Sequence, residues 1–239
     1  MRVRVADKIF DIDGIVFDKD GTLIELESYW LGAARIWVDV AGGDEHGSIL
    51  ASALGLDDDG LVADGPLATA SIADLISLTT ETLSTAGAPD AAERAATAAR
   101  RAATLVAEAT PVPIGGVAEA MRRLDDAGIR LAVATTDERS TTLGMLEAMG
   151  VSRLISPVLT GDGEGPFKPD PQVLGSIAEL WRTTPDRILM VGDSERDRAT
   201  AVNGGAAGFV LVADSPRISA DATVPSIDRI VPAPTSGHP

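Results

Sequence analysis

The sequence of 239 residues contains no cysteine. This absence excludes disulfide bonds, thiolate catalysis and zinc sites built on thiolates. It is compatible with a reducing compartment. The chain also lacks a run of about 18 apolar residues and a signal-peptide pattern at its N-terminus. We therefore expect a soluble, cytoplasmic protein.

Aromatic residues and lysines are scarce. Aromatics make up 3% of the chain and hydrophobic residues together 45%, so Leu, Val, Ile and Ala are expected to form the core. Lysine occurs only at Lys8, Lys19 and Lys168, and the other 17 of the 20 basic residues are arginines. A lysine is thus an unusual choice in this chain, and two of the three lie in the motifs described below.

Positive charge is also in the minority, and the formal net charge is −16. Because nucleic acids and anionic membranes are polyanions, this charge disfavours both as partners. It does not exclude a small anionic substrate, since a local cation and a bound metal ion can reverse the field inside a site. The oligomeric state is left open.

The segment from Gly14 to Leu23 organises the rest of the prediction. Residues 14–17 form a short apolar run, typical of a buried strand, and Asp18 and Asp20 follow it. Ligands in open α/β sheets bind beyond the carboxyl ends of strands. Taken alone, such an acidic turn could equally cap a strand. The same pattern recurs at residues 11–14, where we expect a turn or a short extra strand without chemistry.

Two neighbouring carboxylates can carry out phosphoryl transfer. One attacks phosphorus and forms an aspartyl-phosphate, while the other donates a proton to the leaving oxygen and later accepts one from water. Mg²⁺ is a hard cation that binds carboxylate and phosphate oxygens. The motif therefore predicts a magnesium-assisted reaction at Asp18 and Asp20.

Residues 28–110 are rich in alanine and predict an inserted helical bundle. A second helix is expected at 44–54, a third from Pro66 to about Leu83, and a fourth that ends near residue 109, with Asp90 as its N-cap. The aromatic residues of the first helix recur at helical spacing, which favours a bundle core over a ligand stack. They are Tyr29, Trp30 and Trp37.

From residue 117 onward, predicted helices and strands alternate, which indicates a parallel sheet with right-handed crossovers. The first twelve residues predict an edge strand or hairpin, and the last eight a loose end. The predicted strands lie at 129–134, 154–159, 187–191 and 208–212, and the predicted helices at 117–127, 138–149 and 172–181, with a last one ending at 203.

Each remaining polar motif lies near the carboxyl end of a predicted strand. Thr135 can hydrogen-bond a phosphate oxygen, and Lys168 can neutralise phosphate and the attacking carboxylate. Asp193 can complete a Mg²⁺ shell, and Asp197, one turn on, can hold water or Lys168. Each also has a structural alternative: a strand-end hydroxyl, a surface lysine, a helix N-cap and a solvated helix charge.

Together these motifs resemble the four motifs of the haloacid dehalogenase-like (HAD) hydrolase superfamily. They are Asp18-Lys19-Asp20-Gly21-Thr22-Leu23, Thr135, Lys168-Pro169-Asp170-Pro171 and Gly192-Asp193-Ser194-x-x-Asp197. The resemblance covers residues 13–25 and 114–213, and the helical insert is similar to a C1 cap. It implies an α/β fold with a Rossmann-like core domain of residues 1–26 and 112–239 and a helical cap domain of residues 27–111.

The resemblance also implies roles for single residues. Asp18 would be the nucleophile and Asp20 the general acid and base, with phosphate bound by Thr135 and Lys168. Mg²⁺ would be held by Asp18, the backbone carbonyl of Asp20, and Asp193. Ser194 and Asp197 would support the site. The motifs are similar to the phosphoglycolate phosphatase-like branch, which often has Asn where this chain has Thr136, so a substrate contact there is open.

We expect a Mg²⁺-dependent phosphatase of a small phosphorylated metabolite. A dehalogenase would not need Asp20, and the sugar phosphomutases in question usually carry Val in place of Thr22. A non-catalytic binding protein would be expected to lose a motif carboxylate. The helical insert is expected to close over the site and to set specificity among phosphoglycolate, sugar phosphates and nucleotides. Its candidate contacts are Glu25, Tyr29 and Arg35.

Overall fold

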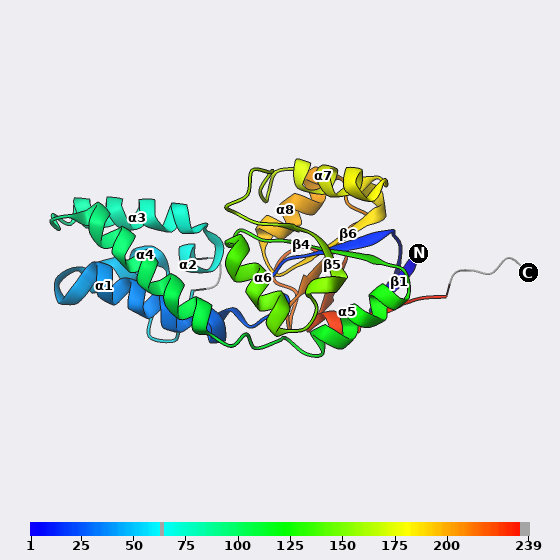
Figure 1. Ribbon diagram of the computed structural model, residues 1–239, viewed down its shortest axis with the longest axis horizontal. Coiled ribbons are helices and arrows are strands. Elements are labelled where there is room, and N and C mark those ends of the chain that lie inside the picture. Colours follow the sequence, from blue (N-terminus) through cyan, green and yellow to red (C-terminus); the bar gives the residue numbers. More distant parts are fainter. Residues whose placement is uncertain (63–64, 235–239) are drawn as a thin grey trace, which may run out of the picture. The chain divides into compact units, whose positions relative to one another are not determined.

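The computed structural model describes residues 1–62 and 65–234, and the side chains of all of these except residues 28 and 29. The chain folds into two compact units. One consists of Met1–Glu25 and Pro113–Pro239, and the other of Leu26–Val112 (Figure 1). The first unit has an α/β architecture, and the second, inserted after the first strand of the main sheet, is helical.

The α/β unit is built on a parallel sheet of six strands within the described residues, in the order β5-β4-β3-β6-β7-β8. Every neighbouring pair runs parallel. The strands are β3 (Gly14–Phe17), β4 (Arg130–Ala134), β5 (Ile155–Leu159), β6 (Ile188–Gly192), β7 (Gly208–Val212) and β8 (Ala222–Val224). This order places β3 between β4 and β6, so the carboxyl ends of these three strands are neighbours.

Helices cover both faces of this sheet, as expected for right-handed crossovers that move first to one side of β3 and then to the other. Helices α5 and α6 lie on one face, and α7 and α8 on the other (Figure 1). Their bounds are α5 (Val117–Asp126), α6 (Arg139–Ala148), α7 (Gln172–Trp181) and α8 (Glu195–Gly204), with short 3-10 helices at η1 (Ser152–Leu154), η2 (Pro185–Arg187) and η3 (Ile227–Arg229). The alternating pattern predicted from the sequence is confirmed.

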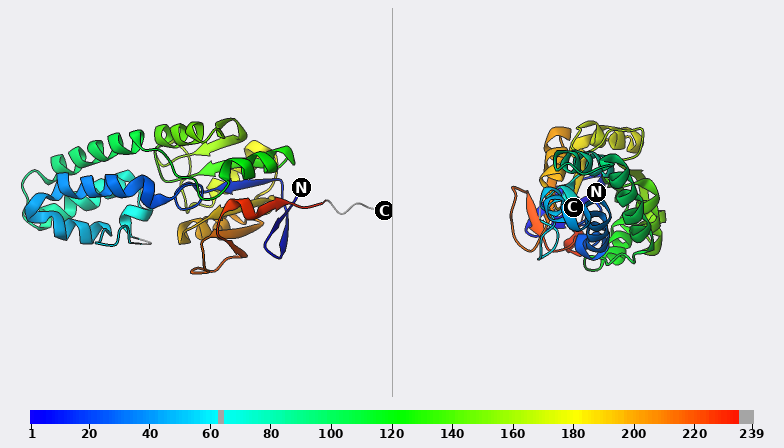
Figure 2. Two further views of the ribbon diagram at one scale, coloured as in Figure 1. Left: turned by 90° about the horizontal axis from the view of Figure 1, so that it is seen from below. Right: turned by 90° about the vertical axis from the view of Figure 1, so that its left-hand side faces the viewer.

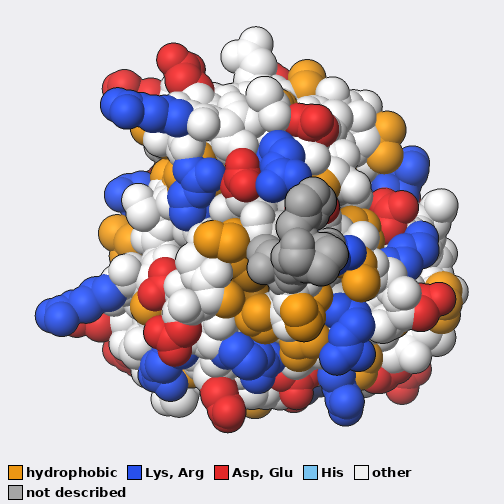
Figure 3. All heavy atoms as spheres, turned by 90° about the vertical axis from the view of Figure 1, so that its right-hand side faces the viewer, with side chains coloured by type: hydrophobic (Ala, Val, Ile, Leu, Met, Phe, Trp, Pro, Cys, Tyr) orange, Lys and Arg blue, Asp and Glu red, His pale blue; other side chains and the backbone are white. Residues whose placement is uncertain are grey.

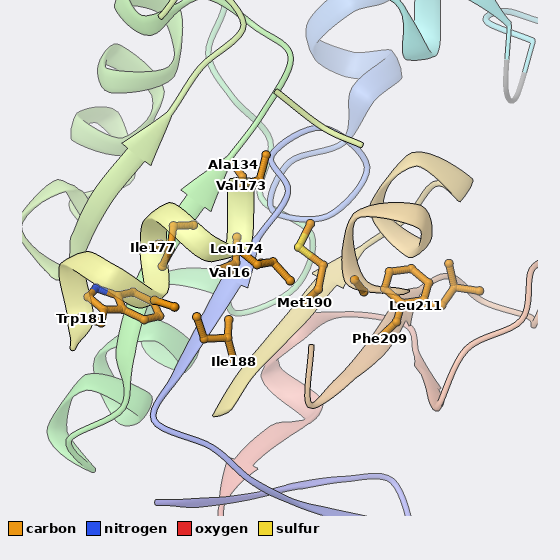
Figure 4. Close-up of a cluster of buried hydrophobic side chains, with 13 residues drawn as sticks. Val16, Ala134, Val173, Leu174, Ile177, Trp181, Ile188, Met190, Phe209 and Leu211 are labelled. Atoms are coloured by element: carbon orange, nitrogen blue, oxygen red, sulfur yellow. The ribbon is translucent and has the colours of Figure 1, made fainter. Parts of the chain in front are cut away.

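A largely aliphatic core joins α7 and α8 to the sheet. Leu174 and Ile177 of α7 pack with Met190 of β6 in a cluster of fully buried side chains (Figure 4). Trp181, at the end of the same helix, lies over the start of β3. A Cβ atom added at Gly14 would lie 2.3 Å from the Trp181 ring, so only glycine permits this approach. The strand that carries the acidic motif is thereby held against α7.

A smaller antiparallel sheet joins the two ends of the described chain. It has the order β2-β1-β9, and Figure 2 shows its red and dark blue segments near the N-terminus. The strands are β1 (Arg2–Val5), β2 (Lys8–Asp11) and β9 (Ile230–Pro232). The predicted N-terminal hairpin is confirmed. The predicted loose end is wrong at Pro232, because β9 pairs with β1. Residues 235–239 lie outside the described part.

The helical unit contains α1 (Leu26–Leu54), α2 (Pro66–Thr69), α3 (Ile72–Thr85) and α4 (Ala91–Glu108). Helix α1 combines the first two predicted helices, which meet at a kink where Gly43 has φ 59° and ψ −163°. The third predicted helix is divided, since Ala70 is extended and Ser71 begins a new helix with its own cap.

Small side chains and one buried hydrogen bond hold the helical unit together. Ala95, Ala98 and Ala102 of α4 are buried, so its backbone packs closely against neighbouring helices. Trp37 of α1 is fully buried and donates to Thr79 Oγ1 of α3 at 3.0 Å. The prediction that the aromatic stripe belongs to the core is confirmed for Trp30 and Trp37, while the Tyr29 side chain lies outside the described residues.

Asp90 does not cap α4 as predicted. It adopts the left-handed conformation, with φ 54°, and its side chain makes no capping hydrogen bond. An N-cap residue normally has extended backbone angles that direct its side chain toward the helix N–H groups. The sequence correctly marked the start of the helix, but the backbone at this position is part of the preceding turn.

The negative net charge is not gathered into one patch on the face of the α/β unit shown in Figure 3. Acidic and basic side chains are interspersed there with apolar ones. Among the described residues, none of the helices has both the length and the apolar character needed to cross a lipid bilayer.

Candidate active site

The parallel register of three neighbouring strands brings the polar motifs to one edge of the sheet. Phe17, the last residue of β3, lies beside Val133 of β4 and Val191 of β6. The residues that follow these positions therefore emerge next to one another. They include Asp18 and Asp20 after β3, Thr135 and Thr136 after β4, and Asp193 after β6.

Lys168 connects two of the carboxylates. Its Nζ donates to Asp18 Oδ1 and, at 2.6 Å, to Asp197 Oδ1. All three residues are buried. Burial opposes the charged form of the lysine, but Asp18 and Asp197 raise the pKa of Lys168 above its ordinary value. Burial also raises the pKa of Asp18, and Lys168 counteracts this effect. The lysine thus acts as a fixed positive charge beside Asp18.

Three carboxylates form a cluster suited to a cation. Asp18, Asp193 and Asp197 each offer an oxygen, and these atoms all lie within 4.8 Å of one another. Burial, with the nearby Asp197, raises the pKa of Asp193 to about 7, and Arg217 opposes this shift. Carboxylate oxygens are the ligands that Mg²⁺ prefers. The chemistry of this donor set therefore fits a hard divalent cation.

Asp197 and Ser194 stabilise the first turn of α8. Ser194 is the N-cap: its Oγ accepts from Asp197 N at 3.3 Å and donates to Asp197 Oδ2 at 2.6 Å. Asp197 is fully buried, which rules out a solvated helix charge. Because Ser194 caps the helix, the alternative interpretation of Asp193 as the N-cap is also wrong.

Asp20 belongs to a second charged group centred on Lys19. Lys19 Nζ lies 2.7 Å from Asp20 Oδ1 and 2.9 Å from Asp137 Oδ2, and Lys19 is fully buried. Burial raises the pKa of Asp20, and Lys19 counteracts this. The Asp20 side chain is not part of the three-carboxylate cluster.

The turn after β4 is organised by hydrogen bonds to its backbone. Thr135 is buried, and its Oγ1 accepts from Asp137 N at 3.1 Å. Asp137 Oδ1 accepts from Glu138 N at 2.7 Å. Gly161 N, in the loop after β5, donates to Asp137 O at 2.8 Å. Thr136 is half-buried between these residues. The turn is therefore fixed both by its own hydrogen bonds and by the loop after β5.

Arg217 also contacts the site. Its Nη2 donates to the backbone oxygen of Asp193 at 2.7 Å and lies 3.3 Å from Asp193 Oδ2. Sequence reasoning missed Arg217, because it lies in the segment after β7, where no motif is recognisable. It assigned no role to Lys19 or Asp137 either. The scarcity of lysine was the signal that could have singled out Lys19.

The remaining candidates make none of the contacts described above for the site. Glu25 is exposed and is the last residue of the N-terminal segment of the α/β unit. Arg35 is exposed on α1 of the helical unit. The side chain of Tyr29 lies outside the described residues. The upstream copy of the acidic motif is structural: Asp13 accepts from Arg187 at 2.9 Å and from Thr183 at 2.6 Å.

The six-stranded parallel sheet, the helical insertion after β3 and the carboxylates at the strand ends define an α/β protein with a polar site at one edge of its sheet. The family model of haloacid dehalogenase-like hydrolases matches residues 12–205. The chain belongs to this superfamily. Its helical insertion after β3 is consistent with the C1 cap implied by the sequence motifs.

Several relatives of this chain are named phosphoglycolate phosphatase. The phosphoglycolate phosphatase of Mesorhizobium japonicum is 38% identical over 101 residues, which cover 42% of this chain and 43% of the relative. That of Rhodospirillum rubrum is 34% identical over 131 residues, covering 52% and 54%. The chain thus matches only about half the length of these curated relatives or less.

A solved structure extends the likeness in fold to almost the whole chain. The crystal structure of a predicted phosphoglycolate phosphatase from Haemophilus somnus 129PT superposes with a TM-score of 0.68 at 20% identity, covering 91% of this chain and 96% of that one. At this identity the superposition shows the shared fold.

Proposed function

We propose that this HAD-type hydrolase is a Mg²⁺-dependent phosphatase that acts on a small phosphorylated metabolite through an aspartyl-phosphate at Asp18. The observation that carries the proposal is the contact of Lys168 Nζ with both Asp18 and Asp197. Asp193 adds a third carboxylate to this group. The proposed nucleophile thus contacts a fixed positive charge and also belongs to a carboxylate cluster suited to a divalent cation.

In the first step, an oxygen of Asp18 attacks phosphorus, and the bond from phosphorus to the ester oxygen breaks. Protonated Asp20 gives its proton to the leaving oxygen, which departs as an alcohol. The phosphoryl group is then bound to Asp18. Proton donation matters most for alkyl esters, because an alkoxide is a poor leaving group.

In the second step, water attacks phosphorus. Asp20, now a carboxylate, takes a proton from the water, and the bond from phosphorus to Asp18 breaks. This restores both side chains and releases phosphate. The sum of the two steps is the hydrolysis of a phosphate monoester, and each proton is accounted for by Asp20.

Charge neutralisation around the phosphoryl oxygens completes the proposed mechanism. Lys168 and Thr135 would bind phosphate oxygens, and Thr136 would contact the substrate. Mg²⁺ would be held by Asp18, the backbone carbonyl of Asp20, and Asp193, and would supply positive charge that offsets the acidic cluster. Asp197 would hold Lys168 in place, and Ser194 would support Asp197 through its hydrogen bonds.

Phosphoglycolate is the first substrate to test, because the relatives that match part of this chain carry that name. We further propose residues 1–26 and 112–239 as the catalytic core domain and 27–111 as the cap that selects the substrate. Within this proposal Glu25, Tyr29 and Arg35 are candidate specificity residues.

The decisive experiment measures phosphate release from p-nitrophenyl phosphate and phosphoglycolate, with and without Mg²⁺. Asp18→Asn is expected to lose essentially all turnover, because an amide is a very poor nucleophile. Asp11→Asn is the matched control, since Asp11 opens the second copy of the same motif and is largely exposed. It should keep wild-type activity.

Other results would identify the alternatives. Release of halide from a haloacid would point to a dehalogenase, and interconversion of sugar phosphates without release of phosphate to a phosphomutase. Mg²⁺-independent turnover, or an active Asp18→Asn variant, would contradict the proposed mechanism.

A further inference from the structure

Lys19 occupies a position that stability alone does not explain. It is the middle residue of the acidic motif and is fully buried between the carboxylates of Asp20 and Asp137. Removing a lysine and its partners from water carries a large desolvation penalty. Replacing a buried ion pair with well-packed apolar residues of similar volume often leaves the stability of a protein unchanged or increases it. A role in the reaction would account for the lysine.

We propose that Lys19, anchored by Asp137, is a positioning residue that holds the Asp20 carboxyl group in the orientation required for proton transfer. The inference rests on the proposed function, in which Asp20 is the general acid and base. Lys19 itself does not contact the reacting atoms. It acts through the contact of 2.7 Å between its Nζ and Asp20 Oδ1.

Asp137 is suited to be the anchor because the surrounding turn fixes it. Its second carboxylate oxygen accepts from Glu138 N, its backbone N–H donates to Thr135 Oγ1, and its carbonyl accepts from Gly161 N. Asp137 therefore cannot readily follow a movement of Lys19. A lysine side chain has four rotatable bonds, and the contacts at its ammonium end restrict them.

Asp20 needs such a constraint. It lies in a turn, directly before Gly21, and its side chain is 18% exposed. A carboxyl group that rotates freely would meet the leaving oxygen only part of the time, and small misplacements of a catalytic group cost large factors in rate. The contact with Lys19 selects one orientation.

The same contacts link the acid to the turn that carries Thr135. Since Thr135 is proposed to bind the phosphoryl group, Lys19 and Asp137 relate the position of the proton donor to that of the transferring group. Loss of Lys19 should therefore impair proton donation more than phosphate binding. This distinguishes a positioning role from a purely structural one, which would affect all substrates alike.

The test compares two esters at saturating Mg²⁺: p-nitrophenyl phosphate, whose leaving group needs little protonation, and glycerol 2-phosphate, whose alkoxide needs it. In Lys19→Met, which removes the charge and keeps an unbranched side chain, we expect kcat/KM for glycerol 2-phosphate to fall about 100-fold. The kcat/KM for the nitrophenyl ester should fall less than about 5-fold, because this ratio reports the steps up to departure of the leaving group and not the later attack of water, in which Asp20 also takes part. Asp20→Asn should show the same pattern.

Lys8→Met is the matched control, because Lys8 is a half-exposed lysine in β2 whose nearest acidic partner is Asp221 at 3.9 Å. It should leave both reactions unchanged. Asp137→Asn provides a second route to the same answer if Lys19→Met does not fold. It weakens the anchor while keeping the side-chain shape, and should lower kcat/KM for glycerol 2-phosphate about 10-fold relative to the nitrophenyl ester.

The outcomes separate this inference from the proposed function. Equal losses with both esters in Lys19→Met and Asp137→Asn, or no loss with either ester, would overturn the positioning role while Asp20→Asn still shows selective loss. If the wild-type protein hydrolyses neither these esters nor phosphoglycolate, the proposed phosphatase function fails, and the role of Lys19 fails with it.

Discussion

At the scale of single residues, Gly21 illustrates how closely the loops of the site approach one another. It has a φ of +73°, a conformation that favours glycine, and an added Cβ atom would lie 2.3 Å from Asp193 Oδ2. Two strand ends thus meet where no side chain intervenes, and the Asp193 carboxylate occupies the space that a Cβ would need.

Gly21→Ala should therefore impair both the backbone and the proposed metal site. We expect a loss of about 1 kcal/mol in the free energy of unfolding from the left-handed conformation. Displacement of Asp193 should also raise the Mg²⁺ concentration required for half-maximal activity about 10-fold or more. Urea unfolding and a Mg²⁺ titration of activity measure the two effects.

Gly205→Ala is the control for Gly21→Ala. Gly205, at the end of α8, has a similar φ of +69°, but apart from its neighbours along the chain no described atom lies within 4 Å of the place that an added Cβ would take. Gly205→Ala should lower the free energy of unfolding in the same way, but it should leave the Mg²⁺ concentration for half-maximal activity unchanged. An equal change in both variants would mean that strain, and not the contact with Asp193, is responsible.

Asp13 links the upstream acidic motif to the stability of the fold. Hydrogen bonds from Arg187 and then Thr183 hold the pKa of Asp13 below its ordinary value. A carboxylate with a lowered pKa in the folded state stabilises the protein above its unfolded pKa of about 4, and this contribution is lost as the pH falls through the folded pKa.

Asp13→Asn should lower the free energy of unfolding by about 1 kcal/mol at pH 7, since the hydrogen-bonded pair with Arg187 is partly exposed. The difference from the wild type should shrink at pH values below about 4. Urea unfolding at pH 7 and at about pH 3.5 measures it. Asp11→Asn should have little effect, and a difference independent of pH would contradict the assignment.

At the scale of elements, a side-chain cap determines where α3 begins. Ser71 Oγ accepts from Asp74 N at 3.2 Å, and Asp74 Oδ2 accepts from Ser71 N at 3.3 Å. This reciprocal pair satisfies two N–H groups that the helix itself leaves without partners. It explains why the helical pattern predicted from Pro66 onward is divided in two.

Ser71→Ala should lower the stability of the helical unit by about 1 kcal/mol, because the cap is lost. Ser77→Ala is its control in the same helix: Ser77 is exposed and only donates to Ala73 O, so alanine, a better helix former, should be neutral or slightly stabilising. Thermal unfolding followed by circular dichroism compares them. Equal Tm values for the two variants would argue against the cap.

Most elements were predictable because their signals are local. Helix α7 was predicted at its observed bounds, Gln172–Trp181, and strand β7 at Gly208–Val212. Apolar periodicity and flanking glycines mark such elements in the sequence itself. Strands β8 and β9 were missed, since each has three residues and depends on a partner strand for its hydrogen bonds.

At the scale of the whole molecule, the two ends of the described chain meet in one sheet. Val5 of β1 pairs with Ile230 of β9, and both are fully buried. Ile9 lies in β2 of the same sheet but is 50% exposed. The pairing makes the C-terminal segment part of the α/β unit.

Ile230→Ala should therefore lower the free energy of unfolding by about 2–4 kcal/mol, as expected for truncation of a buried side chain. Ile9→Ala, the same change on the exposed side of the sheet, should stay within about 0.5 kcal/mol of the wild type. Urea unfolding measures both. A small loss in Ile230→Ala would show that β9 contributes little to the unit.

The amino-acid sequence by itself determined the alternating order of strands and helices, the inserted helical segment, and the motifs that contain Asp18, Lys168, Asp193 and Asp197. These follow from local periodicity and from residue types at fixed spacing, which depend on near neighbours along the chain.

Only the tertiary structure decided the pairing of β9 with β1, the contact of Arg217 with Asp193, and the burial of Lys19 between Asp20 and Asp137. The physical reason is that each joins segments far apart in the sequence, whose contact depends on strand register and packing. The sequence shows that Lys19 carries an ammonium group. It does not show which carboxylates will surround that group in the folded protein.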